Sequence, residues 1–350
     1  MKIAIAMVQV PFIKGGAEIH AEMLRDELKK RGHQVDIITI PFKWYPAESI
    51  VKGMYMGRMM DLSEVNGEKI DLVIAMKFPA IYVKHDNKVL WLLHQHRQAY
   101  DLWGTEFGDL ENFPNGKEVR DLIRKYDKIC ISESKRIFTN SQNTANRLKK
   151  YNDIDGIALY HPPLNYEKLH CDNYGDYVFY ASRIDQIKRQ RLLVEAAKYI
   201  KTDAKIVIAG SGSESELKYI DNLIKENHLE SKVKMAGFIS EEEKINYYAN
   251  CLGVYFGAFD EDYGYITLEA YFSKKSVIVH HDAGGPLEFV VDGKNGYVID
   301  ADAKAVAEKI DTWYRDKQLA KKQGEAGYQT LLDNRIDWDY VIDSLLGNEK

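Results

Sequence analysis

The sequence has few cysteines, no long apolar run and no excess of positive charge. Its three cysteines, Cys130, Cys171 and Cys251, are far apart and belong to no CxxC pair or Cys/His cluster, which argues against a zinc site and a disulfide framework. Such cysteine usage is typical of a reducing compartment. The net charge of -5 argues against a nucleic-acid partner. No run reaches the ~18 apolar residues that a membrane-spanning helix requires.

The length of 350 residues is too great for one ordinary core and suits two domains. Hydrophobic residues make up 45% and charged residues 29%, a balance typical of globular proteins. Residues 1–8, one lysine in a short apolar run, have some features of a weak signal sequence, but we interpret them as a buried strand. We therefore expect a cytoplasmic protein that does not cross a membrane.

The first half of the chain alternates short apolar runs with helical patterns. Apolar residues at consecutive positions are typical of parallel strands that are buried on both faces. The expected strands are 2–8, 34–40, 70–75, 88–93, 137–140 and 156–160, and the expected helices include 17–31 and 144–151, the second capped by Ser141. This series predicts a first α/β domain, residues 1–165, with a doubly wound parallel sheet.

The pattern breaks at His161-Pro162-Pro163, and a polar, aperiodic linker follows. A second α/β domain is expected over 170–334, and the apolar helical spacing within 335–350 would let that segment pack on a domain surface. The expected strands are 177–181, 205–209, 233–236, 253–256, 276–279 and 296–299, and the expected helices are 189–200, 214–227, 241–250, 267–272, 303–315 and 336–346. A ligand of two such domains should bind between them, at the carboxyl ends of the strands.

Three segments contain candidate ligand-binding or catalytic residues. Glu261 and Glu269 flank the expected start of a helix, whose free amides can hold a diphosphate or sugar hydroxyls. Alone, such a pair is more often two surface acids at a helix start. Arg183 and Lys188 lie in a loop after a strand and could converge on one diphosphate, although loop cations are usually solvated. Gly15-Gly16 allows close backbone approach to a ligand, or simply a tight turn.

Taken together, these segments resemble the retaining glycosyltransferases of family 4, also called glycosyl transferases group 1. Members have the GT-B fold, in which two Rossmann-like doubly wound domains face each other across a cleft. The resemblance covers nearly the whole chain and includes Asn140-Ser141, His161-Pro162-Pro163, Ala209-Gly210-Ser211-Gly212, Gly237-Phe238 and Gly284-Gly285-Pro286.

The resemblance implies that the first domain binds the acceptor, with segment 335–350 able to pack back on it, and that the second binds a nucleotide sugar. Arg183 and Lys188 would neutralise the donor diphosphate, Glu261 would face the sugar, and Glu269 would bind the ribose. Other implied contacts are Gly15 and Gly16 at the phosphate, Gly237 and Phe238 at the base, and the amides of Tyr263, Gly264, Tyr265 and Ile266 at sugar hydroxyls or phosphates.

Three local features leave alternatives open. Family members often have a histidine at the reacting carbon; matching the strand favours His94, with His96 as the rival and a surface or core histidine as the alternative. Asp262 departs from the family's usual Glu-Gly-Phe-Gly, which leaves the donor undecided. Asp260-Glu261-Asp262 has the D-x-D form of metal-dependent enzymes, but Arg183 and Lys188 already supply positive charge, so we expect neither a metal nor a cofactor.

The predicted function is retaining transfer from a UDP-sugar, with UDP-glucose favoured over a GDP-sugar, to a glycan, lipid-linked or small-molecule acceptor in polysaccharide or glycoconjugate synthesis. The alternatives are a GT-B nucleotide-sugar epimerase and a non-catalytic nucleotide-sugar-binding partner subunit. Residues 44–62 form an amphipathic pattern with several methionines and tyrosines. That segment is either a helix that covers the core or one that contacts the acceptor or the inner face of a membrane.

Overall fold

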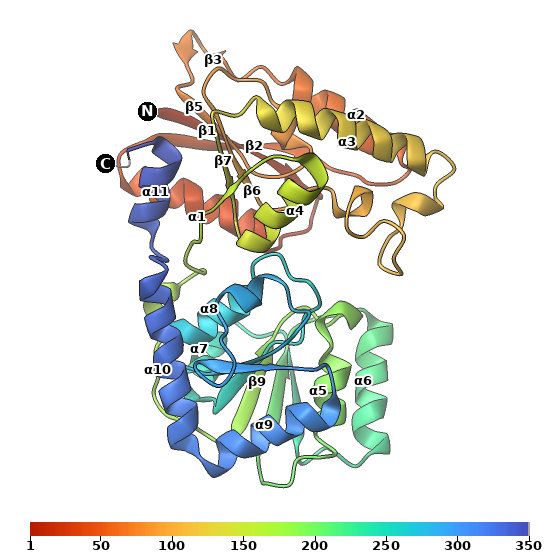
Figure 1. Ribbon diagram of the computed structural model, residues 1–350, viewed down its shortest axis with the longest axis vertical. Helices are drawn as coiled ribbons and strands as arrows, with labels where there is room; N and C mark the ends of the chain where they lie inside the picture. Colours follow the sequence, from red (N-terminus) through yellow and green to blue (C-terminus); the bar gives the residue numbers. More distant parts are fainter. Residues whose placement is uncertain (349–350) are drawn as a thin grey trace. The chain divides into compact units, whose positions relative to one another are not determined.

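The computed structural model describes residues 1–348 and divides into two compact units (Figure 1). Unit 1 comprises Met1–Leu164 together with the C-terminal segment that starts at Asp337, and unit 2 comprises Asn165–Ile336. The chain therefore leaves unit 1, builds the whole of unit 2, and returns to unit 1 for its last helix.

Unit 1 has a six-stranded sheet in the order β2-β1-β5-β6-β7-β8, and every neighbouring pair is parallel. Residues such as Ile5, Ile74 and Leu90 are completely buried, as expected for strands covered on both faces. The strands are β1 (Lys2–Gln9), β2 (Gln34–Pro41), β5 (Leu72–Ala75), β6 (Lys88–Leu92), β7 (Arg136–Thr139) and β8 (Ile157–Ala158), and β3 (Glu64–Val65) with β4 (Glu68–Lys69) forms a separate antiparallel hairpin.

The helices of unit 1 are α1 (Gly16–Lys30), α2 (Glu48–Met59), α3 (Gly116–Ser132), α4 (Gln142–Asn152) and α11 (Trp338–Leu346). The predicted cap of α4 is confirmed, since the Ser141 hydroxyl accepts a hydrogen bond from the Thr144 amide at 3.0 Å. Helix α11 packs beside α1, and α2 lies beside α3 (Figure 1). The seventeen-residue helix α3 is absent from the sequence-based prediction.

A cluster of buried aromatic rings joins four separate segments of unit 1. The imidazole of His20, from α1, stacks on that of His161 with 3.7 Å between ring centroids. Trp91 of β6 meets both rings edge-on, and Trp338 at the start of α11 lies 6.3 Å from Trp91. Burial lowers the pKa of His20 to about 3, and it lowers the pKa of His161 well below its usual range.

We expect this cluster to make the folded protein less stable as the pH falls from 6.5 to 5. The folded state keeps both rings neutral, whereas an unfolded histidine takes up a proton below its ordinary pKa of about 6.5. The free energy of unfolding should therefore fall by up to about 1.4 kcal/mol per pH unit for each histidine. Urea titrations followed by tryptophan fluorescence would measure this slope.

The control for that experiment is the exposed His228, whose replacement by asparagine should leave the slope unchanged. A folded His20→Leu variant should show a smaller slope than the unmodified protein. A free energy of unfolding that stays constant over this pH interval would contradict the prediction.

Unit 2 repeats the architecture with the strand order β11-β10-β9-β12-β13-β14, again with parallel neighbours. These two parallel sheets, together with their helices, confirm the predicted α/β fold class. The strands are β9 (Tyr177–Ala181), β10 (Lys205–Ala209), β11 (Val233–Gly237), β12 (Gly253–Tyr255), β13 (Val277–His280) and β14 (Gly296–Ile299).

The helices of unit 2 are α5 (Gln190–Ala196), α6 (Glu214–Glu226), α7 (Glu241–Asn250), α8 (Tyr265–Phe272), α9 (Ala303–Arg315) and α10 (Lys317–Asp333). The prediction of a helix over 189–200 was wrong at both ends. Arg189 has a left-handed backbone, with φ of 55°, and α5 already ends at Ala196. Helix α10 is a second element that the sequence-based prediction lacks.

Candidate active site

The strand order of unit 2 reverses between β9 and β12, which are neighbours in the sheet. The chain proceeds from β9 to β10 and β11 on one side, and β12 to β14 lie on the other. The loops after β9 and β12 consequently diverge, and in sheets of this kind ligands bind at that point. Arg183 and Lys188 lie in the loop after β9, and Glu261 lies in the loop after β12.

The structure brings Lys188 and Glu261 into direct contact. Lys188 ends the short 3-10 helix η5 (Gln186–Lys188), and its ammonium group donates a hydrogen bond to the Glu261 carboxylate. The same ammonium lies 5.9 Å from the ring centroid of Phe256. Both side chains are mostly covered, with exposed fractions of 19% for Lys188 and 26% for Glu261. Lys188, which is expected to bind the diphosphate, and Glu261, which is expected to face the sugar, thus form one ion pair.

Hydrogen bonds fix the loops that carry this pair. The Phe259 amide donates to the Ile187 carbonyl at 3.0 Å, which joins the loop after β12 to the loop after β9. Both Nη atoms of Arg189 contact the Asp282 carboxylate at 2.7 Å, and this bidentate pair raises the pKa of Arg189 and lowers that of Asp282. The loops after β9, β12 and β13 therefore form one connected frame.

A second set of contacts holds the Glu261 backbone. The Glu261 amide donates to the Ala283 carbonyl, and the Gly285 amide donates to the Glu261 carbonyl, each at 2.8 Å. A Cβ atom at Gly285 would lie 2.6 Å from the Asp262 carbonyl oxygen, so this close pairing requires glycine. The predicted motif Gly284-Gly285-Pro286 therefore supports the loop that carries Glu261.

Arg183 extends into solvent, with 71% of its side chain exposed, and its guanidinium lies 3.5 Å from the Asp185 carboxylate. Its backbone is held by the glycine loop after β10. Gly210 has φ of 141°, and a Cβ atom there would lie 1.8 Å from the Ser182 carbonyl oxygen. The Ile184 amide also donates to the Ser211 carbonyl at 2.8 Å, so hydrogen bonds join the glycine loop to the Arg183 segment.

Glu269 lies in α8 and is 7% exposed. One carboxylate oxygen accepts a hydrogen bond from Lys244 at 2.9 Å, and the other accepts one from the Tyr248 hydroxyl at 2.8 Å. Burial opposes the charge of Lys244, but Glu269 and Glu241 raise its pKa above the usual range. The carboxylate is held from α7 in a fixed orientation.

Helix α8 begins beside this carboxylate. Its N-cap is Gly264, with φ of 87°, where a Cβ atom would lie 2.7 Å from Pro286 Cγ. Tyr265 and Ile266 belong to the first turn, whose amides have no acceptor within the helix itself. Tyr263 is buried and packs edge-on against Tyr265, and burial raises the pKa of Tyr265.

Gly237 and Phe238 lie at the carboxyl end of β11. Gly237 has φ of 70°, and its carbonyl accepts a hydrogen bond from the Gly210 amide at 2.7 Å. The Phe238 ring is 85% exposed, which is unusual for a large apolar side chain and leaves its face available for stacking.

Comparison with known proteins gives the family. The model of "Glycosyl transferases group 1" matches residues 167–330, which is nearly all of unit 2. The second unit therefore matches the group 1 glycosyltransferases. One relative is the uncharacterized glycosyltransferase MJ1607 of Methanocaldococcus jannaschii, 22% identical over 89% of this chain and 88% of that protein.

Another relative is the alpha-1,3/1,6-mannosyltransferase ALG2 of Dictyostelium discoideum, 32% identical over 38% of this chain. That match spans only 33% of ALG2. Solved structures extend the similarity of fold to both units. Sucrose-phosphate synthase of Thermosynechococcus elongatus aligns with a TM-score of 0.74 at 17% identity over 97% of this chain and 96% of that one.

A second solved structure is Anabaena HepE in complex with UDP-glucose, which aligns with a TM-score of 0.69 at 16% identity over 99% of each chain. Matches that cover nearly the whole of both chains confirm the GT-B fold.

The remaining predicted site residues lie in unit 1. Gly15 is the N-cap of α1 and Gly16 its first residue, and the Gly15 amide donates to the Glu18 carboxylate at 2.9 Å. Gly15 has an extended backbone, so its conformation does not itself require glycine. Their proposed approach to a phosphate stays a prediction.

The two candidate histidines differ in environment. His94 follows β6, is partly exposed, and has its Nδ1 2.6 Å from the Gln95 carbonyl oxygen. His96 stacks on Phe78 and packs edge-on against Phe42, and burial lowers its pKa to about 3. Both histidines are partly exposed, and which of them lies at the reacting centre stays a prediction.

Sequence reasoning did not single out Arg189, Asp282, Lys244 or Tyr248. Arg189 and Asp282 are 93 positions apart in the sequence, and Lys244 and Glu269 are 25 positions apart. No local sequence pattern reveals contacts over such separations. Over residues 1–348, no group of three His, Cys, Asp or Glu side chains is placed to hold a metal ion. Within the same range, no helix is long and apolar enough to span a bilayer.

Proposed function

We propose that this protein transfers a glycosyl group from a nucleoside-diphosphate sugar to a hydroxyl of a glycan, lipid-linked or small-molecule acceptor. The observation that carries the proposal is the Lys188–Glu261 ion pair at the strand-order reversal of unit 2, with the buried Glu269 on the adjoining helix. Lys188 offers a cation to the leaving diphosphate. Glu261 and Glu269 each offer a carboxylate that can bind vicinal hydroxyls.

We propose the following roles. Unit 2 binds the donor: Lys188 and Arg183 bind the diphosphate, Glu261 binds sugar hydroxyls, and Glu269 binds both ribose hydroxyls. The amides at the start of α8 bind sugar hydroxyls or phosphates, and the exposed Phe238, beside Gly237, stacks on the base. Unit 1 binds the acceptor and contributes Gly15, Gly16 and His94.

In the proposed reaction, the bond between the anomeric carbon and the diphosphate oxygen breaks, and the acceptor oxygen bonds to that carbon on the same face. The departing diphosphate takes the acceptor's proton. Lys188 and Arg183 stabilise the negative charge that grows on the diphosphate, which is the electrostatic contribution expected to matter most. No metal ion is needed in this scheme, and the product keeps the donor's anomeric configuration.

We propose that the donor is a uridine nucleotide sugar, in line with the UDP-glucose complex of the structural neighbour HepE. We expect UDP-sugars to raise the melting temperature of the protein, while GDP- and ADP-sugars do so less. At about 100 times its Kd, a ligand for one site adds roughly 2.7 kcal/mol to the free energy of unfolding. A thermal-shift series with these nucleotide sugars measures the effect, and no shift with any of them would refute the donor site.

The same series can be extended to separate transfer from isomerisation. An epimerase would convert the bound donor with no acceptor present, whereas a transferase would release nucleoside diphosphate and form a glycosylated acceptor. Mass spectrometry of the nucleotide pool, with and without a panel of sugar acceptors, distinguishes these outcomes.

A further inference from the structure

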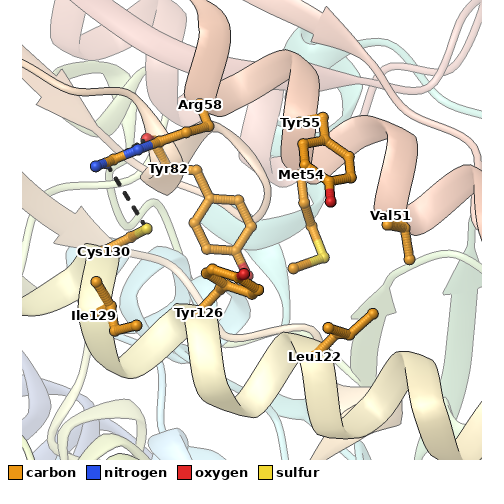
Figure 2. Close-up of a pocket in the computed structure, with 9 residues that line it drawn as sticks. All are labelled: Val51, Met54, Tyr55, Arg58, Tyr82, Leu122, Tyr126, Ile129 and Cys130. Atoms are coloured by element: carbon orange, nitrogen blue, oxygen red, sulfur yellow. Dashed lines mark hydrogen bonds between the residues drawn. The ribbon is translucent and has the colours of Figure 1, made fainter.

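Asp127 of α3 is a completely buried acid that the proposed glycosyl transfer does not use. Each of its carboxylate oxygens accepts a hydrogen bond from a tyrosine: the Tyr82 hydroxyl donates at 2.5 Å and the Tyr100 hydroxyl donates at 2.8 Å. Tyr82 ends the short 3-10 helix η1 (Ala80–Tyr82) and lines a cavity together with Tyr126 of α3, with its hydroxyl turned toward that helix (Figure 2). The carboxylate is thus held from two other segments of unit 1.

The Tyr100 hydroxyl extends these contacts toward the candidate histidines. It accepts a hydrogen bond from the side-chain amide of Asn152, the last residue of α4, at 3.0 Å. The Asn152 side-chain oxygen in turn accepts one from the Gln95 side chain at 2.8 Å. Gln95, Tyr100 and Asn152 are each at most 3% exposed. One buried hydrogen-bond chain therefore joins Gln95, in the loop after β6, to Asp127 in α3.

The three bonds of this hydrogen-bond chain share one direction. Gln95 donates to Asn152, Asn152 donates to Tyr100, and the Tyr100 hydroxyl donates to the carboxylate. In such an arrangement each group polarises the next, and a negative charge at the end strengthens the bonds before it. Burial raises the pKa of Asp127 to about 7, while the two tyrosine hydrogen bonds oppose that rise and favour the charged form.

Gln95 lies between the two candidate histidines. Its side chain is 1% exposed, whereas His94 and His96 are partly exposed. Its carbonyl oxygen lies 2.6 Å from His94 Nδ1. A Gln95 side chain that is fixed on Asn152 therefore limits where this carbonyl, and with it the His94 imidazole, can lie. Such support matters in an active site, because a misplacement of about 1 Å can slow a reaction by about 10²-fold.

We propose that Asp127 is a positioning residue that acts on segment 94–96 through this hydrogen-bond chain. It does not touch substrate. It orients Gln95 from the interior of unit 1, and Gln95 orients His94. The effect on turnover rests on the proposed function, whereas the restraint on segment 94–96 does not.

Tyr100→Phe and Tyr82→Phe are a matched pair of variants, since each removes one hydroxyl from the same carboxylate and keeps its ring. Only Tyr100→Phe breaks the hydrogen-bond chain to Gln95. Hydrogen exchange of the ligand-free protein is measured by mass spectrometry on a peptide that spans residues 93–99. Exchange should become about five- to tenfold faster in Tyr100→Phe, the effect of one lost buried hydrogen bond, and should stay unchanged in Tyr82→Phe.

Turnover of UDP-glucose, with the best acceptor of the sugar panel, gives a second readout. The kcat should fall by about tenfold in Tyr100→Phe and equally in Gln95→Leu. The double variant should lose no more than either one, because both changes break the same hydrogen-bond chain. Tyr82→Phe should keep the kcat of the unmodified protein. UDP affinity, measured by calorimetry, should be the same in all variants, because the proposed diphosphate contacts lie in unit 2.

Equal hydrogen exchange in Tyr100→Phe and Tyr82→Phe would overturn the proposal, whatever the activity. Equal kcat in these two variants, with an active unmodified protein, would also overturn it and leave the proposed function intact. An unmodified protein that turns over no nucleotide sugar would refute the proposed function and, with it, the effect of Asp127 on turnover. Gln95→Leu, at the other end of the hydrogen-bond chain, provides the same tests if Tyr100→Phe does not fold.

Discussion

Replacement of Lys188 by methionine should slow the release of UDP from UDP-glucose by about 10²–10³-fold. In the proposed reaction, Lys188 stabilises the charge that develops on the departing diphosphate, and loss of one such preorganised donor has an effect of this size. Methionine keeps the apolar stem beside Phe256 and removes only the ammonium group. The melting temperature of the ligand-free protein should therefore change much less than its turnover.

The matched control is Lys198→Ala, which removes an exposed lysine of the same unit. Turnover is measured as nucleotide released per enzyme, and UDP affinity is measured by calorimetry. Lys188→Met should also weaken UDP binding by about ten- to a hundredfold, the usual range for a charged hydrogen bond. If the variant binds UDP and turns over UDP-glucose like the control, Lys188 does not bind the diphosphate.

Replacement of Glu261 by glutamine should have opposite effects on two ligands. In the free protein the Glu261 carboxylate is bonded to the Lys188 ammonium, so a diphosphate must compete for that ammonium. Glutamine weakens this competition, and UDP should bind up to about fivefold more tightly, corresponding to the ~1 kcal/mol of a partly exposed ion pair. Turnover of UDP-glucose should fall by about 10²-fold, because the sugar loses its carboxylate partner.

Calorimetry with UDP and turnover of UDP-glucose are compared for Glu261→Gln and for the control Glu308→Gln, which changes an acid that is 72% exposed on α9. The double variant Lys188→Met/Glu261→Gln should show non-additive changes, since the two residues contact each other. Weaker UDP binding by Glu261→Gln would show that the ion pair does not compete with the diphosphate.

The parallel sheets were predictable because buried strands leave a simple local signal. Strands β9, β10 and β14 begin and end at the predicted residues, 177–181, 205–209 and 296–299. Their side chains are apolar at consecutive positions, which a two-sided core requires and a surface segment would not tolerate. The strand β8 shows the limit of this signal, since only Ile157–Ala158 of the predicted 156–160 pairs in the sheet.

The missed helices lack such a signal. The buried residues of α10 are Ala320, Gln323, Gly324, Gly327 and Leu331, so small and polar side chains occupy most of its packed face. Helix α3 does have apolar residues at helical spacing, such as Val119, Ile123 and Cys130, but they are separated by closely spaced charges. Helix α5 is shorter than predicted, and no local pattern in the sequence marks the left-handed backbone of Arg189 or the end of the helix at Ala196.

For the candidate site, the sequence and its family resemblance predicted residue types but not their pairing. Lys188 and Glu261 are 73 positions apart, and their ion pair depends on β9 and β12 being neighbours in the sheet. The support of Glu269 by Lys244 and Tyr248 likewise depends on the packing of α7 against α8. Tertiary placement, rather than local pattern, decides both contacts.

The return of the chain to unit 1 has a consequence for biosynthesis. On the ribosome, residues 1–164 emerge long before Trp338, whose ring covers Trp91 and His161 in the finished protein. The Arg136 guanidinium donates a hydrogen bond to the Leu345 carbonyl at 2.9 Å, and this bond can form only after Leu345 has been synthesised. The nascent first unit therefore exposes an apolar surface until residues 338–346 have been synthesised, and a chaperone that binds such surfaces should associate with it during translation until α11 covers them.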